Sequence, residues 1–321
     1  MRTVGVFPAS GGLGGSTIAH LRKIFPDDHL ILISRYPENQ PAEYSQGGVR
    51  LRQASYESSP WELEASFKDV DVLFLISYPS HVRDYRVQVQ IPAVDAAVRA
   101  GVSHIFYSSL AFAGPVSSSL SKAEVMQAHL VTESHLKFIT ANNPKLTFTA
   151  IREGLYSESY PIYTAFFDAT NPSSEIYIPH NGKGPGVAWV KRDELGEATA
   201  RLIAHYAGAT VTGLESIDLE NQILLLTGPK VWTLEETVEQ LSKCVGKPIA
   251  IREVSVDEYV SQLQVTTVFG SQEKATTWAT AWAAIKAGET AVVSPLLEHV
   301  LGRKSEDFDV TLENHLGASH E

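Results

Sequence analysis

The residues best suited to chemistry are four glycines close to the start of the chain. Gly11, Gly12, Gly14 and Gly15 come directly after the apolar run 3–7. Glycine accepts positive φ and lets a ligand approach the backbone closely, so the chain can turn sharply from a buried strand into a helix. The turn then presents bare N–H groups and the positive end of a helix dipole, which suits a pyrophosphate.

We therefore predict a dinucleotide-binding turn between a strand and a helix. The expected cofactor contacts in this turn are Ala9, Ser10, Gly11, Gly12, Leu13 and Gly14. A glycine-rich loop alone is a weak signal, and a flexible turn without a ligand is the alternative. The position of the loop, after an apolar strand and before an amphipathic helix, favours nucleotide binding.

The end of the second expected strand indicates which dinucleotide is bound. The apolar run 29–34 ends at Arg35. An acidic residue at this point usually binds the ribose hydroxyls of NAD, whereas a basic residue accommodates the 2′-phosphate of NADP. Because a guanidinium offers phosphate a bidentate fork, we expect NADP(H) rather than NAD(H). An exposed arginine with no role is the alternative.

Strands and helices alternate along the first half of the chain. The expected strands are 3–7, 29–34, 49–51, 70–76, 103–108 and 146–152, and helices are expected near 60–63 and at 82–100 and 121–142. This alternation predicts an α/β fold with a doubly wound parallel sheet, the Rossmann fold. Ligands of such sheets lie beyond the carboxyl ends of the strands. The expected cofactor site therefore also includes Ser77, Tyr78, Pro79, Ser108 and Ser109.

The alternation loosens beyond residue 152. We expect a nucleotide-binding domain at 1–152 and a smaller C-terminal α/β substrate-binding portion at 153–321, with about 191–227 returning to the first domain. The segment 153–170 is rich in aromatic residues, which suits an apolar ligand pocket, although ordinary core packing is the alternative for each residue. The expected substrate contacts are Tyr156, Tyr160, Tyr163, Phe166 and Trp189, and Leu155 and Tyr156 are expected to contact the cofactor.

Short sequence patterns predict where several of the remaining helices begin or end. Capping boxes at Thr233 and Ser255 predict two helix starts. A further helix is expected from Ser294 to Gly302, because a cap followed by proline begins it and glycine ends it. The tail from Leu312, with His315 and His320, is expected to be loosely ordered.

The amino-acid composition limits the classes of protein to which the chain can belong. The chain has 321 residues, 44% of them hydrophobic, and a net charge of −11, which argues against a surface for nucleic acid. The single cysteine, Cys244, excludes an internal disulfide and a cysteine zinc site, and no metal is expected. No apolar run approaches the ~20 residues of a membrane span, and the first strand leaves no room for a signal peptide. We expect a cytoplasmic protein, monomeric or homodimeric, without a membrane or nucleic-acid partner.

Several stretches resemble the NmrA-like group of atypical short-chain dehydrogenases, and within it the type 2 NADPH quinone oxidoreductases. They are Pro8–Gly14, the strand end Ser108-Ser109-Leu110, His129–Glu133, Ile151–Tyr160 and Leu301–Lys304. The run Ile151–Tyr160 is the most specific, since it is similar to the family's Leu-Arg-Asn-Gly-Trp-Tyr-(Ser/Thr)-Glu-Asn-Tyr. Pro8 departs from the family pattern, which has glycine there. Because proline has no N–H, the early turn must be built differently.

The resemblance implies a Rossmann domain holding NADP(H) and a smaller portion that closes a substrate cleft. Ordinary short-chain dehydrogenases use Ser with Tyr-x-x-x-Lys, and His129 and Glu133 stand at the tyrosine and lysine positions, four residues apart on one helical face. The expected catalytic residues are therefore His129, Ser108 and Glu133. Ser108 would hydrogen-bond a carbonyl oxygen, and His129 would act as general acid because an unperturbed histidine titrates near neutral pH. A structural histidine, with water as the proton donor, is the alternative.

The leading hypothesis is an NADPH-dependent oxidoreductase that reduces a quinone-like or other conjugated or aromatic carbonyl compound, bound as an apolar small molecule. Two alternatives remain open. One is an NmrA-type NADP(H)-binding redox sensor that acts through a protein partner without hydride transfer. The other is a non-redox isomerase or cyclase acting on a small metabolite.

Overall fold

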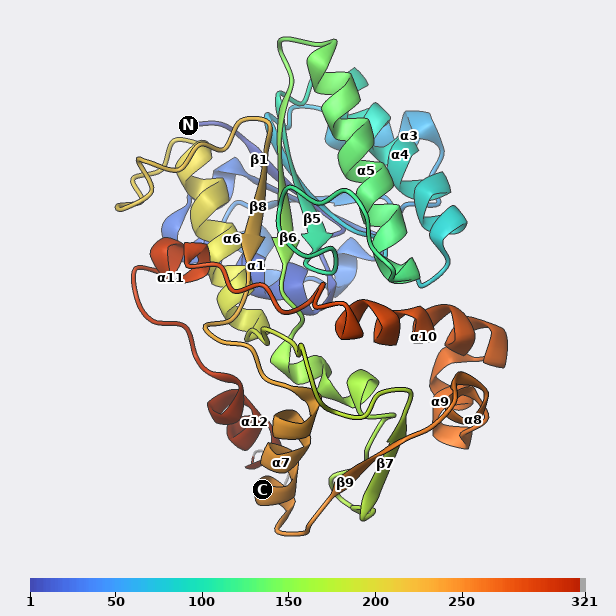
Figure 1. The fold of residues 1–321 in the computed structure, drawn as a ribbon. Coiled ribbons are helices and arrows are strands. Elements are labelled where there is room, and N and C mark those ends of the chain that lie inside the picture. Colours follow the sequence, from blue (N-terminus) through green and yellow to red (C-terminus); the bar gives the residue numbers. More distant parts are fainter. Residues whose placement is uncertain (318–321) are drawn as a thin grey trace.

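A seven-stranded parallel sheet forms the centre of the computed structural model, which describes residues 1–317 (Figure 1). The strand order is β3-β2-β1-β4-β5-β6-β8, and every neighbouring pair is parallel. The strands are β1 Val4–Phe7, β2 Leu30–Ser34, β3 Arg50–Gln53, β4 Val72–Ile76, β5 His104–Leu110, β6 Thr147–Glu153 and β8 Gln222–Leu226. Their apolar runs are continuous because helices cover both faces of the sheet. The predicted doubly wound α/β fold is confirmed.

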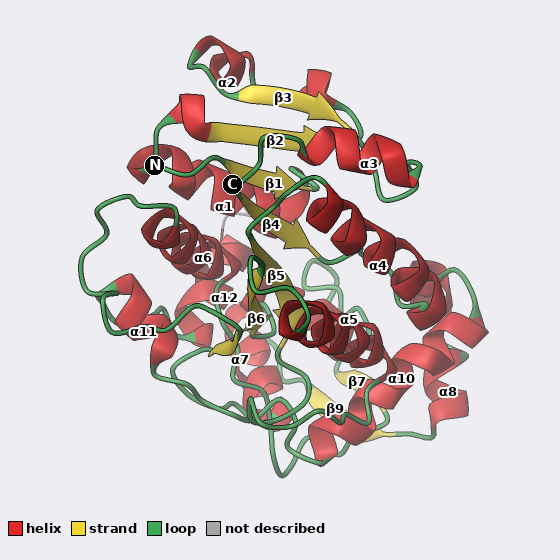
Figure 2. Ribbon diagram, turned by 90° about the horizontal axis from the view of Figure 1, so that it is seen from above, coloured by secondary structure: helices red, strands yellow, loops and turns green. Residues whose placement is uncertain are grey.

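Two helical layers enclose this sheet (Figure 2). One layer contains α1 (Gly11–Ile24) and α6 (Arg192–Tyr206), with α11 (Leu296–Leu301) against α6. The other contains α3 (Pro60–Phe67), α4 (Arg83–Arg99) and α5 (Glu124–Ala141). A short helix, α2 (Ala42–Gln46), lies between β2 and β3 in the sequence. Because side chains alternate along a strand, successive residues of β5 and β6 face different layers.

The smaller part of the molecule lies beyond the carboxyl ends of the strands, in the lower half of Figure 1. It contains a two-stranded parallel sheet of β7 (Glu175–Ile178) and β9 (Ala250–Glu253). Its helices are α7 (Leu234–Val245), α8 (Val256–Val260), α9 (Leu263–Phe269), α10 (Gln272–Lys286) and α12 (Phe308–Gly317), with a 3₁₀ helix at Ser157–Tyr163. Both predicted capping boxes are confirmed, at Thr233 and Ser255, and Gly302 ends α11 with φ of 70°.

The expectation of a loosely ordered tail from Leu312 is wrong within the described residues. Helix α12 runs to Gly317, and Phe308, Leu312 and Leu316 are buried in the core of the smaller part. These apolar residues are four positions apart, which is the spacing of an amphipathic helix. His320 lies outside the described residues.

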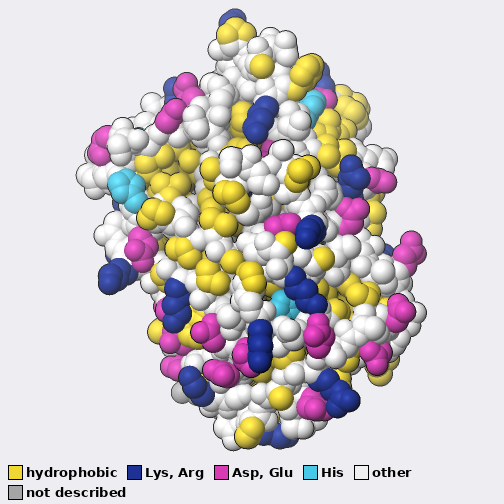
Figure 3. Space-filling view, viewed as in Figure 1, with side chains coloured by type: hydrophobic (Ala, Val, Ile, Leu, Met, Phe, Trp, Pro, Cys, Tyr) yellow, Lys and Arg dark blue, Asp and Glu magenta, His cyan; other side chains and the backbone are white. Residues whose placement is uncertain are grey.

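The surface carries charges of both signs. On the face in Figure 3, Lys and Arg side chains lie among Asp and Glu side chains over the lower half of the view. Ion pairs in the smaller part include Lys286 with Glu253, 2.8 Å apart, and Lys230 with Asp307, 3.4 Å apart. Within residues 1–317, none of the helices has the length and apolar character needed to cross a membrane.

Candidate cofactor and substrate site

Helix α1 begins inside the glycine turn, at Gly11, where φ is 79°. A side chain at this φ would be strained, so the turn requires glycine there. A Cβ on Gly12 would lie 2.8 Å from guanidinium atoms of Arg192, and a Cβ on Gly14 would lie 3.0 Å from Cδ1 of Ile76. The first turn of α1 contains no acidic residue. Its free N–H groups and the helix dipole therefore remain suited to an anion.

The turn is anchored although Pro8 has no N–H to donate. The Phe7–Pro8 peptide bond is cis. The N–H of Ala9 donates to the carbonyl oxygen of Ile33 at 2.7 Å, and the N–H of Ser10 donates to that of Pro8 at 2.8 Å. These bonds fix the chain between β1 and α1 and tie it to the end of β2. The family's first glycine is thus replaced by a different local structure that keeps the following glycines in place.

A groove follows the carboxyl ends of β1 to β4. It consists of two hollows of about 360 and 300 Å³ that share Ser10, Arg35 and Tyr36. The first hollow also contacts Ala9, Gly11, Gly15, Gln40 and Tyr44, and the second also contacts Pro8, Tyr56, Glu57, Tyr78 and Pro79. An extended dinucleotide fits a groove of this position and form. Leu13, in contrast, is buried in the core beneath α1.

Arg35 lies in this groove beside an acid that the sequence pattern did not reveal. Its Nη2 is 2.5 Å from Oε2 of Glu57, and the side chains are 52% and 35% exposed. The hydroxyl of Tyr78 donates to Oε1 of Glu57 at 2.9 Å. Partial burial raises the pKa of Glu57, but the hydrogen bonds from Tyr78 and Arg35 outweigh it and hold that pKa at about 2. Glu57 is therefore ionised, and Arg35 retains further N–H groups for a phosphate.

The other cofactor residues expected at strand ends differ in their exposure. Tyr78 and Pro79 line the groove. Ser77 is turned inward, with its hydroxyl donating to Oε1 of Gln90 at 2.9 Å. Leu155 is 5% exposed, and its carbonyl oxygen accepts from the N–H of Val190 at 3.0 Å. Tyr78 and Pro79 are thus placed for direct contact with a ligand, whereas Ser77 and Leu155 support the backbone around it.

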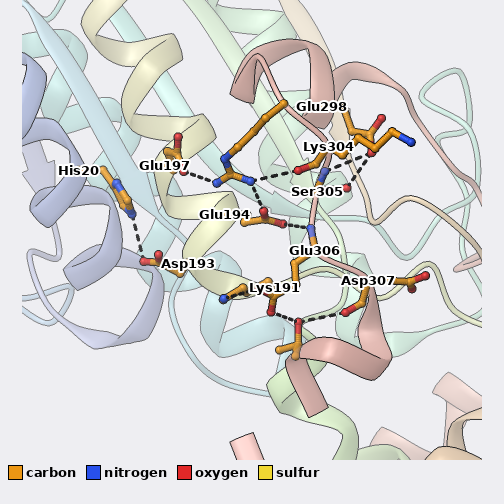
Figure 4. A network of polar contacts seen from close by, with 12 residues as sticks. His20, Lys191, Asp193, Glu194, Glu197, Glu298, Lys304, Ser305, Glu306 and Asp307 are labelled. Carbon is orange, nitrogen blue, oxygen red and sulfur yellow. Dashed lines mark hydrogen bonds and ion pairs between the residues drawn. The ribbon is translucent and has the colours of Figure 1, made fainter. Parts of the chain in front are cut away.

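Helix α6 brings a second arginine to the glycine turn. Arg192 is its first residue, and the guanidinium lies against Gly12. The neighbouring Asp193 accepts a hydrogen bond from Ser16 at 2.6 Å and lies 3.1 Å from Nε2 of His20, so that the first turn of α6 is joined to the middle of α1 (Figure 4). Sequence reasoning missed Arg192, because about 180 residues separate it from the turn that it contacts.

The motif Leu301–Lys304 supports the same helix. The guanidinium of Arg303 contacts the carboxylates of Glu194 and Glu197 on α6, at 2.6 Å in the case of Glu197. The following segment, 305–307, also contacts α6, since the N–H of Glu306 donates to Glu194 at 2.9 Å (Figure 4). Residues 303–306 thereby hold the N-terminal part of α6, which carries Arg192, against α1.

Glu133, an expected catalytic residue, lies in a buried ion pair. Its Oε1 accepts from Nε of Arg152 at 2.9 Å and from Ser109 at 2.7 Å, and its Oε2 accepts from Nη2 of Arg152 at 2.7 Å. The two charged side chains are 3% and 1% exposed. Arg152 also donates to the carbonyl oxygens of Pro115 and Ser118. This geometry favours a structural role for Glu133 and Ser109 instead of contact with a substrate.

His129 does not have the properties expected of the general acid. Its Nε2 is 2.7 Å from Nη2 of Arg86, and its Nδ1 is 3.0 Å from the hydroxyl of Tyr107. A guanidinium only donates, so Nε2 accepts and the proton is assigned to Nδ1. Burial, aided by the charges of Arg86 and Arg152, lowers the pKa of His129 well below its usual value. A pKa lowered in this way disfavours the protonated imidazole that a general acid needs, and both ring nitrogens are already bonded, so the geometry favours the alternative of a structural histidine.

A different polar group lies on the opposite side of these strand ends. Ser108 and Glu153 face the α1 and α6 layer, and both are buried, with 5% and 1% exposure. The hydroxyl of Tyr156 lies 3.5 Å from Oε2 of Glu153. Among the described residues, Oε1 of Glu153 has no hydrogen-bond partner. Burial raises the pKa of Glu153 well above its usual value, although Tyr156 and Ser108 oppose the shift.

Most of the aromatic residues expected to contact a substrate lie in the core of the smaller part. Tyr160, Tyr163 and Trp189 are at most 4% exposed. The rings of Tyr163 and Trp189 meet edge to face at 5.2 Å, and the indole of Trp189 donates to Thr237 at 3.1 Å. Phe166 lines a separate surface hollow with β7. Packing is the better interpretation for the first three residues, and Tyr156 alone lies beside the strand ends.

A further hollow of about 310 Å³ lies between the sheet and α10. It is formed where α4, α5 and α10 begin, and its lining includes His81, Val82, Glu124, Lys274 and Thr277. The ring of His81 packs 5.4 Å from those of Phe269 and Trp278, also beyond the end of β4. The sequence did not predict α10, so this wall of the site was missed. The Trp278 and Trp282 pair, four residues apart within an alanine-rich stretch, is the signal for its buried face.

Comparison with known proteins agrees with this architecture. A model of the NmrA-like family matches residues 1–301. The NmrA-like family domain-containing oxidoreductase flvB of Aspergillus flavus is 32% identical over 298 residues, which cover 92% of this chain and 89% of that protein. Quinone oxidoreductase 2 of Escherichia coli is 28% identical over 264 residues, or 81% of each chain.

A solved structure extends the similarity to a cofactor complex. The triphenylmethane reductase of Citrobacter sp., complexed with NADP(H), matches with a TM-score of 0.75 and 26% sequence identity, over 97% of this chain and 99% of that one. The family model covers nearly the whole chain, and the flvB protein is similar over almost its full length. The chain belongs to the NmrA-like family.

Proposed function

We propose that the protein is an NADPH-dependent reductase of atypical short-chain dehydrogenase type, acting on a small apolar molecule with a conjugated carbonyl group such as a quinone. The observation that carries this proposal is the groove along the carboxyl ends of β1 to β4, which has Arg35 in its lining and the glycine turn, with Arg192 against Gly12, beside it. Similarity to proteins named as oxidoreductases, one of them complexed with NADP(H), supports it.

The residues present fit the cofactor. The N-terminal turn of α1 and the guanidinium of Arg192 would hold the diphosphate, because both offer N–H donors at one place. Arg35, where the two hollows of the groove meet, would hold the 2′-phosphate. When bound, NADPH supplies the hydride that reduces the substrate. Tyr78 and Pro79 would border the cofactor where the groove leaves β4.

The substrate would bind beyond the carboxyl ends of β4, β5 and β6, between the hollow beneath α10 and the side chain of Tyr156. The hollow is lined by charged and polar side chains together with His81 and Val82. The ring of His81, held against the buried rings of Phe269 and Trp278, offers a flat molecule an aromatic face. A quinone or other conjugated acceptor is favoured because its reduced form is a stabilised oxyanion, which places a modest demand on the proton donor. The resemblance places His129 and Glu133 where ordinary short-chain dehydrogenases have Tyr-x-x-x-Lys, and here these two side chains contact Arg86 and Arg152.

The test combines binding with turnover. Purified protein is titrated with NADPH, NADH and NADP⁺ by calorimetry, and NADPH absorbance is then followed with a panel of quinones, enones and ketones. We expect NADPH to bind more tightly than NADH and to be oxidised by a quinone. Arg35→Ala should weaken NADPH binding about 10- to 100-fold, the equivalent of losing charged hydrogen bonds worth 1.5–3 kcal/mol, with little effect on NADH.

Arg99→Ala is the matched control, because Arg99 lies in an exposed ion pair with Glu64 away from the groove. It should leave both affinities unchanged. Normal NADPH binding without oxidation by any acceptor would contradict the reductase proposal and direct attention to the redox-sensor alternative. Product formation without a change in NADPH absorbance would direct it to the isomerase or cyclase alternative.

A further inference from the structure

Two of the buried glutamates, Glu133 within α5 and Glu153 at the end of β6, have different surroundings. Glu133 is neutralised by Arg152, and both of its oxygens accept hydrogen bonds. Glu153, at the end of β6, forms no ion pair with any described residue, and its Oε1 lacks a hydrogen-bond partner in that part of the chain.

We propose that Tyr156 donates the proton that completes reduction of the substrate and that Glu153 returns a proton to it, a step that rests on the reductase function proposed above. Tyr156 is partly exposed, whereas Glu153 is 1% exposed, so a substrate can contact the phenol but not the carboxyl group. The phenol O–H of Tyr156 donates a long hydrogen bond of 3.5 Å to Oε2 of Glu153, and a small side-chain movement brings the two groups within the range of proton transfer. Tyr156 is the catalytic residue, and Glu153 acts through it.

The electrostatics of the pair support this order of transfer. A carboxyl group buried without a cation is favoured in its neutral, protonated form. Burial also raises the pKa of Tyr156 well above its usual value; Glu153 and Glu158 raise it further, and the charge of Arg192 from α6 lowers it. A phenolate left at Tyr156 would therefore be costly. A carboxylic acid next to it removes that cost by giving up its own proton.

The reaction balances without a further reactant. The substrate carbon accepts the hydride, and the carbonyl π bond breaks to leave an oxyanion. The phenol O–H of Tyr156 breaks, and its proton forms the O–H bond of the product. The carboxyl proton of Glu153 then restores the phenol, and the carboxylate of Glu153 recovers a proton from solvent before the next turnover. Ser108, which is buried beside this pair, would orient the carboxyl group.

The test compares Glu153→Gln and Tyr156→Phe with Glu64→Gln, a control at an exposed ion pair. Glutamine has the shape of the neutral acid and cannot release a proton. We expect both site variants to lower kcat with a quinone at least 10²-fold, the usual contribution of a general acid, while the NADPH affinity measured by calorimetry changes less than threefold. The kcat of the wild-type protein should fall as the pH rises and Glu153 loses its proton. The kcat of Glu153→Gln should not show this decrease.

A second readout needs neither cofactor nor turnover. Infrared difference spectra of the unliganded protein near neutral pH should contain the carbonyl band of a protonated carboxylic acid, and Glu153→Gln should lack it. The relay is overturned if this band is absent, or if Glu153→Gln retains the wild-type kcat and pH profile. If the reductase function itself is wrong, the result is different, because the wild-type protein then reduces no acceptor at all. That result would overturn the proton transfer from Tyr156 together with the reductase function. If Glu153→Gln does not fold, the kcat and pH profile of Tyr156→Phe decide.

Discussion

Replacement of Glu133 tests whether the buried ion pair is structural. The substitution Glu133→Gln keeps the size of the side chain but leaves Arg152, 1% exposed, without its counter-ion. The native carboxylate accepts three hydrogen bonds, two from Arg152 and one from Ser109. Breaking a buried ion pair by removing one partner costs about 3–5 kcal/mol. This is a large fraction of the 5–15 kcal/mol by which folded domains are usually stable, so the midpoint of urea denaturation should fall markedly.

The assay is urea denaturation followed by circular dichroism, with Glu64→Gln as the control. Glu64 forms an exposed ion pair with Arg99, and such pairs contribute about 0–1 kcal/mol. The double substitution Glu133→Leu with Arg152→Met should recover only part of the lost stability, since the carbonyl oxygens of Pro115 and Ser118 lose their donors. A Glu133→Gln protein with wild-type stability and no turnover would refute the structural interpretation and restore Glu133 to the catalytic group.

Three further outcomes are expected. Glu57→Gln should strengthen NADPH binding about 2- to 5-fold by calorimetry, because a carboxylate beside the expected 2′-phosphate is removed, and an unchanged affinity would place that phosphate elsewhere. Arg192→Ala should weaken NADPH and NADH equally, by about tenfold, because both share the diphosphate that Gly12 and Arg192 would hold; selective loss of one cofactor would contradict this. Burial, aided by Arg2, lowers the pKa of His104 from 6.5 to about 3. The free energy of unfolding that neutral His104 contributes is therefore present above pH 6.5 and falls by about 1.4 kcal/mol for each pH unit below it. Urea denaturation of His104→Gln should show a smaller dependence of this free energy on pH.

The sheet could be predicted from the sequence because its strands are local signals. Runs such as 29–34 and 70–76 are apolar on both faces, and each leads through a turn into a helix. The six strands expected in the first half are all present, with ends shifted by at most a few residues. Helices α10 and α12 were missed, because their apolar residues are widely spaced among alanines or near the end of the chain.

The candidate site could be predicted only in part. The glycine turn and Arg35 follow β1 and β2 directly, so their place at the edge of the sheet follows from the order of the elements. Glu57 and Arg192 come from the loop after β3 and from α6, and sequence spacing does not relate them to the turn. Their contribution appears only when the sheet and its two helical layers are assembled.

The sequence by itself determined the fold class, the family and the position of the phosphate turn, because each is encoded in short runs of apolar and glycine residues. Tertiary structure decided the protonation and the roles of the buried polar groups. His129 and Glu133 share a helical face as expected, but Arg86 and Arg152, from other elements, bind them there. Within residues 1–317, Glu153 has no such partner, and burial keeps its pKa raised. The charge of a buried group depends on its neighbours in space and on its distance from water, and neither is contained in the order of residues along the chain.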